Sequence, residues 1–159
     1  MPVTPMCLVF VVDTQSREVL LGMKHRGIGS SNIVGLGGHV DPGETAMEAA
    51  VREAREEALI RLDSAQIDHA GQIRFRFPAK PNWDQDVDVF VTTAWSGTPA
   101  PTAEITPRWY PLDDLPLDEM WDDARYWLQE TLAGRPLNST ITFASDNKTV
   151  ANVTTVAEA

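Results

Sequence analysis

The sequence predicts an α/β (α+β) fold in which a mixed β-sheet is sandwiched between α-helices. Three observations lead to this fold class. Apolar runs with the alternation typical of strands occur near the start, in the middle and at the end of the chain. A helical segment rich in Ala, Glu and Arg follows a cluster of glycines, and a second helical segment comes late. Strands interleaved with helices in this way favour a sheet with helices on its faces.

The first third of the chain is expected to begin with a β-hairpin. Its strands are the β-branched apolar runs at residues 6–12 and 19–23, and the polar residues 13–18 form the turn between them. A loop is expected at residues 27–31, which read Gly-Ile-Gly-Ser-Ser. The glycines and the proline within residues 35–43 then predict backbone bends and close approach to a ligand rather than packing.

A helix is expected over residues 44–59, entered from Asp41-Pro-Gly. Acidic residues in its first turn suit the positive end of the helix dipole. Two alternating segments at residues 73–77 and 87–92 are expected to be strands, separated by a proline-rich loop that contains Trp83.

The last third is expected to add one more strand, one helix and a hairpin. Residues 108–110 form a short strand candidate, and residues 121–132 form a helix closed by Gly134. Residues 140–143 and 149–156 then pair around a turn at Asp146.

Length, net charge and cysteine content argue against several classes of partner and location. The 159 residues fit a single domain over residues 1–159. A net charge of −10 argues against long nucleic acid and anionic membrane as partners, because both are negatively charged. Cys7 is the only cysteine, and neither a signal peptide nor a membrane-spanning run is apparent, so we expect a cytoplasmic protein.

Three glutamates of the central helix carry the strongest chemical signal. Glu53, Glu56 and Glu57 are spaced so that they share one face of a helix, where their like charges repel. A hard divalent cation such as Mg²⁺ or Mn²⁺ would offset this repulsion and bridge the carboxylates to phosphates. A simply solvated acidic face is the alternative for such a triplet, and the glycine-rich turn just before the helix favours the metal site.

The segment from Gly38 to Ile60 resembles the Nudix box, Gly-x5-Glu-x7-Arg-Glu-U-x-Glu-Glu-x-Gly-U, where U is aliphatic. The matching residues are Gly38, Glu44, Arg52, Glu53, Glu56, Glu57 and Ile60. Ala54 is small at an aliphatic position, and Leu59 replaces the last glycine, which predicts a slightly different helix exit with the metal chemistry retained. Segments starting at Val19, Gly71, Trp95 and Met120 extend the resemblance to the MutT-related oxidised-purine nucleoside triphosphatases.

The resemblance implies a Nudix fold and hydrolysis of a nucleoside triphosphate to a monophosphate and pyrophosphate. It implies catalytic roles for Glu53, Glu56, Glu57 and Arg52, with Glu53 or Glu56 orienting the attacking water. The implied Mg²⁺ ligands are the Gly37 carbonyl and the carboxylates of Glu53, Glu56, Glu57 and Glu104. The implied substrate contacts are Lys24, Leu36, Gly38, His39, Phe75, Trp121 and Asp123.

Two base-reading positions depart from the subfamily. Val34 stands where an asparagine is expected, and Ala124 replaces a second acid. The sequence therefore leaves two classes of substrate. One is an oxidised purine nucleotide such as 8-oxo-dGTP or 2-hydroxy-dATP. The other is another nucleoside diphosphate derivative, namely a dinucleoside polyphosphate, ADP-ribose or a nucleotide sugar. A nucleotide-binding regulator without hydrolysis is a further alternative. The expected partner is a small nucleotide, with no long nucleic acid and no membrane, and the chain is expected to be a monomer, with a dimer left open.

Overall fold

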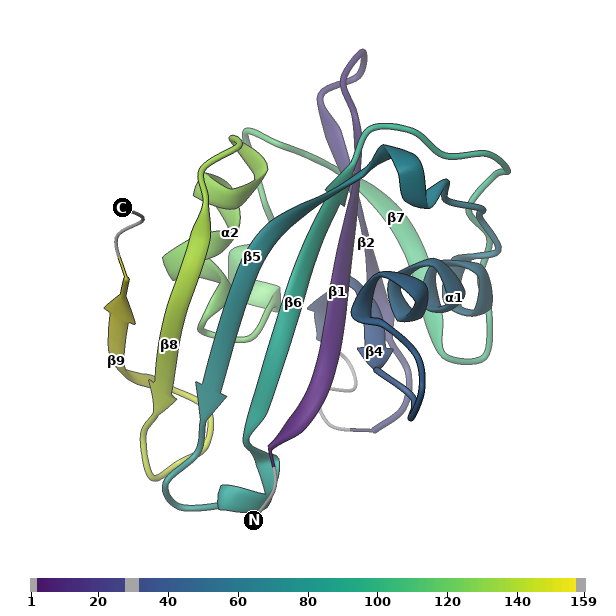
Figure 1. Ribbon diagram of the computed structural model, residues 1–159. Coiled ribbons are helices and arrows are strands. Elements are labelled where there is room, and N and C mark those ends of the chain that lie inside the picture. Colours follow the sequence, from purple (N-terminus) through teal and green to yellow (C-terminus); the bar gives the residue numbers. More distant parts are fainter. Residues whose placement is uncertain (1–2, 28–31, 157–159) are drawn as a thin grey trace.

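The computed structural model describes residues 3–27 and 32–156, in which all nine strands join one sheet (Figure 1). The strands are β1 Thr4–Asp13, β2 Glu18–Lys24, β3 Ile33–Val34, β4 Leu36–His39, β5 Ile67–Arg76, β6 Gln85–Thr92, β7 Ile105–Pro111, β8 Leu137–Phe143 and β9 Val150–Thr155. Their order across the sheet is β3-β2-β1-β6-β5-β8-β9, with β4 pairing β1 and β7 pairing β2. The pairs β1–β6 and β5–β8 are parallel and the others antiparallel, so the sheet is mixed.

Strand β1 lies at the centre and divides the interior into two cores. Successive side chains of a strand point to opposite faces of the sheet. Cys7, Val9 and Val11 therefore pack on one face, whereas Phe10 and Val12 pack on the other. Its first half pairs with β4 and its end pairs with β2, so one strand positions both the glycine segment and the N-terminal hairpin.

One helix covers each of these faces, as Figure 1 shows. Helix α1, Ala46–Ala58, packs on β1 and β4, and helix α2, Ala124–Leu132, packs behind β5 and β8. Trp127 and Leu128 are the main α2 residues in the second core, where the Trp127 ring meets Phe10 edge-on. The predicted sandwich of a mixed sheet between helices is thus confirmed.

Both predicted hairpins are present. Val12 pairs with Val19 in the first, and Ile141 pairs with Val153 in the second. The prediction of bends over residues 35–43 was wrong in part, because Leu36–His39 is a strand that pairs with β1. Of the loop expected at residues 27–31, residues 28–31 lie outside the described part of the chain.

The helices begin later than the sequence suggested. Helix α1 starts at Ala46 rather than Glu44, because the Thr45 side chain caps it. Helix α2 starts at Ala124 rather than Trp121, and Asp123 precedes its first turn. Strand β5 begins at Ile67 and strand β7 at Ile105, both earlier than predicted. Within the described residues, no helix has the length and apolar character needed to cross a membrane.

Candidate active site

The N-terminal cap and the buried face of helix α1 fix its position. The Thr45 hydroxyl accepts a hydrogen bond from the backbone N–H of Glu48, and the Glu48 side chain accepts one from the N–H of Thr45. This capping box satisfies two amides that a helix otherwise leaves unpaired. Small buried side chains let the helix lie close to the sheet, and they belong to Ala49, Ala50, Ala54 and Ala58. Alanine at position 54 therefore serves packing.

Three carboxylates meet between α1 and the loop before β7. One oxygen from each of Glu53, Glu57 and Glu104 lies within 4.8 Å of the other two. The Glu53 side chain is only 12% exposed, Glu57 is buried, and Glu104 is exposed. Oxygen-only donors at this spacing fit a hard divalent cation such as Mg²⁺ or Mn²⁺.

The electrostatics of the group also fit a cation. Burial raises the pKa of Glu57 to about 8, although a hydrogen bond from the Gly37 amide acts in the opposite direction. Burial likewise raises the pKa of Glu53, which the neighbouring Arg52 opposes. The charge of Glu104 adds to the effect on both groups. Without a cation, the folded protein therefore favours protonated carboxyl groups here.

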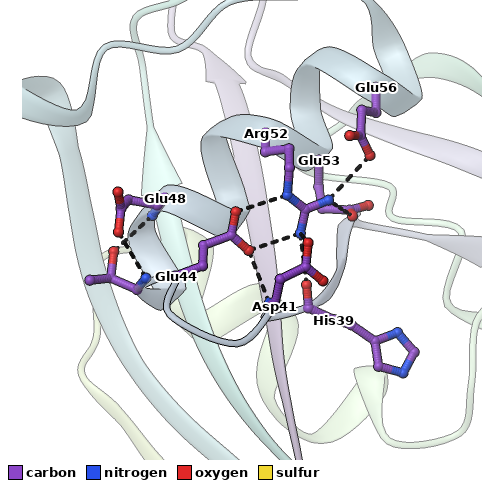
Figure 2. A network of polar contacts seen from close by, with 8 residues as sticks. His39, Asp41, Glu44, Glu48, Arg52, Glu53 and Glu56 are labelled. Carbon is purple, nitrogen blue, oxygen red and sulfur yellow. Dashed lines mark hydrogen bonds and ion pairs between the residues drawn. The ribbon is translucent and has the colours of Figure 1, made fainter.

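Arg52 ties the helix to the turn that precedes it (Figure 2). Its Nε donates to Glu44 Oε2 at 2.9 Å, and its Nη1 donates to Glu53 Oε1 at 2.6 Å. Its Nη2 donates to the backbone carbonyl of His39 at 3.0 Å. The hydrogen bonds from Arg52 lower the pKa of Glu44 to about 2. This planar guanidinium, with several fixed donors, orients Glu53 toward the other carboxylates.

Glu56 occupies a different environment from Glu53 and Glu57. Its Oε2 accepts a hydrogen bond from Arg52 Nη1 at 3.2 Å, and its side chain is 53% exposed. The group of three carboxylates found among the described residues does not include it. The contact with Arg52 holds one of its two carboxylate oxygens.

Two glycines of β4 make room for the carboxylates. The Gly37 N–H donates to Glu57 Oε1 at 2.8 Å, and a Cβ added at Gly37 would lie 2.0 Å from the Cys7 carbonyl oxygen. A Cβ at Gly38 would lie 2.9 Å from Glu53 Oε2. The close approach to a ligand expected of this segment stays a prediction, and the glycines let the strand lie close to Cys7 and Glu53.

A cavity of about 530 Å³ extends from the carboxylates to the core under α2. Glu57, Gly37, Gly38, His39 and Lys24 line one end. Aromatic side chains dominate the other end: Phe75, Phe77, Trp83, Trp121, Trp127 and Phe143. The charged end and the aromatic end suit a ligand that carries phosphates and a flat ring.

Most of the expected substrate residues lie along this cavity, and Leu36 is the exception. Leu36 is fully buried in the core beneath α1 and is not among the described residues that line the cavity. The Lys24 charge lies close enough to lower the pKa of Glu57. Asp123 is buried, and its Oδ2 accepts a hydrogen bond from Trp127 Nε1 at 2.8 Å. Burial raises the pKa of Asp123 to about 7.

The two positions that depart from the subfamily also line the cavity. These residues are Val34 and Ala124, whose apolar side chains offer no hydrogen bond to a base. Sequence reasoning missed the cavity residues Phe77, Trp83, Met120, Phe143, Asn82 and Gln85. Phe77 follows Phe75 by two residues in the alternating segment 73–77, which gives a signal for it, although β5 ends at Arg76. Phe143 comes from a distant strand.

Comparison with known proteins agrees with this geometry. The model of the NUDIX domain family matches residues 3–131. The chain is 38% identical over 117 residues to the oxidized purine nucleoside triphosphate hydrolase of Mus musculus, covering 74% of this chain and 73% of the relative. It is 37% identical over 124 residues to the protein of the same name from Danio rerio, covering 78% of each.

Solved structures give the same fold. A MutT protein from Bacillus halodurans superposes with a TM-score of 0.79 and 21% identity, over 96% of this chain and 97% of that one. A MutT NUDIX hydrolase from Burkholderia pseudomallei gives a TM-score of 0.65 and 24% identity, over 73% and 88%. The expected Nudix fold is confirmed, and the chain belongs to the NUDIX domain family of hydrolases.

Proposed function

We propose that the chain is a Mg²⁺-dependent pyrophosphohydrolase that converts an oxidised purine nucleoside triphosphate, such as 8-oxo-dGTP or 2-hydroxy-dATP, into its monophosphate and pyrophosphate. The observation that carries the proposal is that one cavity contains Glu57, a member of the carboxylate group, together with a wall of aromatic rings. The mouse and zebrafish relatives carry the name of this activity. This substrate would place the chain in nucleotide-pool sanitation.

The carboxylate end would hold the metal. Glu53, Glu57 and Glu104, with the Gly37 carbonyl, would be ligands of Mg²⁺, and Mn²⁺ suits the same oxygen donors. When bound, the ion neutralises charge on the phosphates and on the departing pyrophosphate. Lys24 and His39, at the same end of the cavity, would contact the phosphates.

Either Glu53 or Glu56 would orient the attacking water. Glu53 is the better placed, because it lies within the carboxylate group while Glu56 faces solvent beside Arg52. Arg52 would act by fixing the Glu53 side chain, with which it shares a 2.6 Å hydrogen bond. Glu56 stays a candidate ligand through the carboxylate oxygen that does not contact Arg52.

The aromatic end would hold the base. Trp121 and Phe75 offer ring faces for stacking, and Asp123 offers a buried carboxyl for the edge of the purine. We further propose that the chain acts as a monomer on small nucleotides in the cytoplasm.

A second substrate class is favoured by one specific observation. The apolar side chains of Val34 and Ala124 line the cavity where the subfamily reads its base. A pocket with fewer hydrogen-bonding groups discriminates bases less. Another nucleoside diphosphate derivative, such as a dinucleoside polyphosphate, ADP-ribose or a nucleotide sugar, is therefore the alternative substrate.

The test is a substrate panel assayed with Mg²⁺ for release of pyrophosphate and phosphate. The panel contains 8-oxo-dGTP, 2-hydroxy-dATP, the normal triphosphates, ADP-ribose and diadenosine polyphosphates, with kcat/KM taken for each. We expect an oxidised purine triphosphate to be preferred over its normal parent by about 100-fold. The Glu57→Gln variant controls for contaminating phosphatases. Preference for ADP-ribose or a dinucleoside polyphosphate would select the alternative.

A further inference from the structure

The aromatic end of the cavity contains a polar side chain that the proposed function leaves unused, that of Gln85. Gln85 begins β6, and its Cα partners are Phe75 on β5 and Thr4 on β1. Val87 and Val89 pack in the core under α2, and side chains alternate along a strand, so Gln85 faces the same side. Its amide therefore lies beside the Phe75 ring at the end proposed to hold the base.

Its place in the sheet matches the length of a nucleotide. Strand β4, with Gly37 and Gly38, is separated from β6 by β1 alone. Across the sheet, two interstrand spacings amount to about 10 Å. Along β1, the three residues from Thr4, opposite Gln85, to Cys7, opposite Gly38, add about 10 Å. The resulting separation of about 14 Å leaves room for a ribose between phosphates at the glycine strand and a base beside Gln85.

The Gln85 amide is available for a ligand. Among the hydrogen bonds of the described residues, none involves its side chain, and the residue is only half-buried. Asp123, another polar residue that lines the cavity, already accepts a hydrogen bond from Trp127. Val34 and Ala124 offer no polar side-chain atom. Gln85 thus supplies a donor and an acceptor at the aromatic end of the cavity.

We propose, on the basis of the function proposed above, that Gln85 is a specificity-determining residue for purines oxidised at C8. Oxidation there turns N7 from an acceptor into an N–H donor and adds a carbonyl oxygen beside it. Gln85 Oε1 accepts from N7–H, and Gln85 Nε2 donates to the new oxygen. A normal purine meets this amide with an N7 acceptor and a C–H group, so only one of the two bonds can form.

The experiment compares Gln85→Met with Gln72→Met. Methionine keeps the length of glutamine and removes its hydrogen bonds. Gln72 lies on the neighbouring strand β5 and alternates with Ile73 and Phe75, so the same change there falls on the opposite face of the sheet. We expect kcat/KM of Gln85→Met for 8-oxo-dGTP to fall about tenfold or more, mainly through KM, because two base contacts are lost.

Three internal controls sharpen the result. The kcat/KM for dGTP should fall by no more than about threefold, since dGTP makes at most one of the two bonds. The loss for 2-hydroxy-dATP should be smaller than for 8-oxo-dGTP, because its C8 edge is unaltered. Calorimetry should show that Gln85→Met loses more affinity for 8-oxo-dGMP than for dGMP. Gln72→Met should behave as the parent protein in every assay.

Several outcomes would overturn the inference. An unchanged ratio of 8-oxo-dGTP to dGTP in folded Gln85→Met removes the specificity role and leaves the proposed function standing. Equal losses for all substrates show a structural role for Gln85. If Gln85→Met does not fold, Gln85→Thr, which suits a strand, takes its place with the same expectations. If the parent protein hydrolyses no purine triphosphate, the inference and the proposed function fail together.

Discussion

Glu56 and Glu57 are neighbours in the chain, but the helix gives them opposite surroundings. Glu57 is buried against the Gly37 amide, near Glu53 and Glu104. Glu56 points outward and contacts Arg52. A metal bound between the carboxylates would therefore depend on Glu57 far more than on Glu56.

Replacing each residue by glutamine distinguishes the role of Glu57 from that of Glu56. We expect Glu57→Gln to lower kcat about a thousandfold or more, because a bound ion contributes several kcal/mol to the transition state. Glu56→Gln should lower kcat by a much smaller factor. Steady-state assays at saturating Mg²⁺ measure both, and Glu48→Gln, an exposed residue of the same helix, is the control. Equal losses at positions 56 and 57 would contradict the three-carboxylate site.

The raised pKa of Glu57 makes the free energy of unfolding of the metal-free protein depend on pH. Its carboxyl titrates near 4.5 when unfolded and at about 8 when folded. Between these values the folded state binds the extra proton, so the free energy of unfolding falls as pH rises. The raised pKa of Asp123, about 7, acts in the same direction. We expect Tm in EDTA to fall across this range.

Thermal unfolding of Glu57→Gln tests the assignment. Glutamine cannot ionise, so the decline of Tm with pH should become shallower in EDTA, with the remaining slope attributed to Asp123 and Glu53. Saturating Mg²⁺ should reduce the slope of the parent protein, since it stabilises the ionised carboxylates. The same slope in parent and variant would rule out burial of an ionisable Glu57.

At the scale of the element, the start of α1 depends on its cap. Thr45→Ala removes the hydroxyl that accepts from the Glu48 N–H. We expect a loss of about 1 kcal/mol in the free energy of unfolding. Urea titration measures it, and Thr45→Ser, which keeps the hydroxyl, should unfold close to the parent midpoint. If Thr45→Ser loses as much free energy of unfolding as Thr45→Ala, the hydroxyl does not stabilise the helix.

The end of α1 is strained. Leu59 has φ 60° and ψ 29°, a left-handed conformation that glycine adopts freely and leucine does not. Its side chain is 55% exposed, so little packing compensates. We expect Leu59→Gly to raise the free energy of unfolding by about 1 kcal/mol, measured by urea titration. A destabilised variant would mean that the Leu59 side chain contributes more packing than its exposure indicates.

Leu59 also shows why some element boundaries follow from the sequence. The helix ends where the Nudix pattern has a glycine, because the backbone there turns left-handed whatever residue is present. Helix α1 was predicted to within two residues, since capping and helix propensity are local. Strands β3 and β4 were missed, because two to four residues form strands only through pairing with β1 and β2.

For the whole molecule, we expect one cooperative thermal transition that Mg²⁺ shifts upward. Within residues 3–27 and 32–156 the nine strands belong to one sheet, and its two cores share β1, so we propose that residues 1–159 form a single domain. Mg²⁺ at about 100 times its Kd should raise Tm by roughly 8 °C. Calorimetry with EDTA as control measures both features. Two separate transitions would contradict the single domain, and an unchanged Tm would contradict the metal site.

The candidate site was predictable in its chemistry and less so in its shape. Glu53 and Glu57 followed from helical spacing, whereas Glu104, far along the chain, was found only through the family resemblance. The outward position of Glu56 depends on the rotamer that Arg52 selects, which spacing does not determine. The aromatic wall needed the tertiary structure, because β8 brings Phe143 against Phe77 from a distant segment.

The division of β1 between two faces has a consequence for how such a protein can diverge. Its Cys7, Val9 and Val11 support the helix that carries the carboxylates, while the residues between them face the core beside the aromatic pocket. We therefore expect substitutions on the α2 side to alter the aromatic pocket more than the group of carboxylates. On this plan, the part of the cavity proposed to hold the base could diverge while the carboxylate-bearing helix keeps its support.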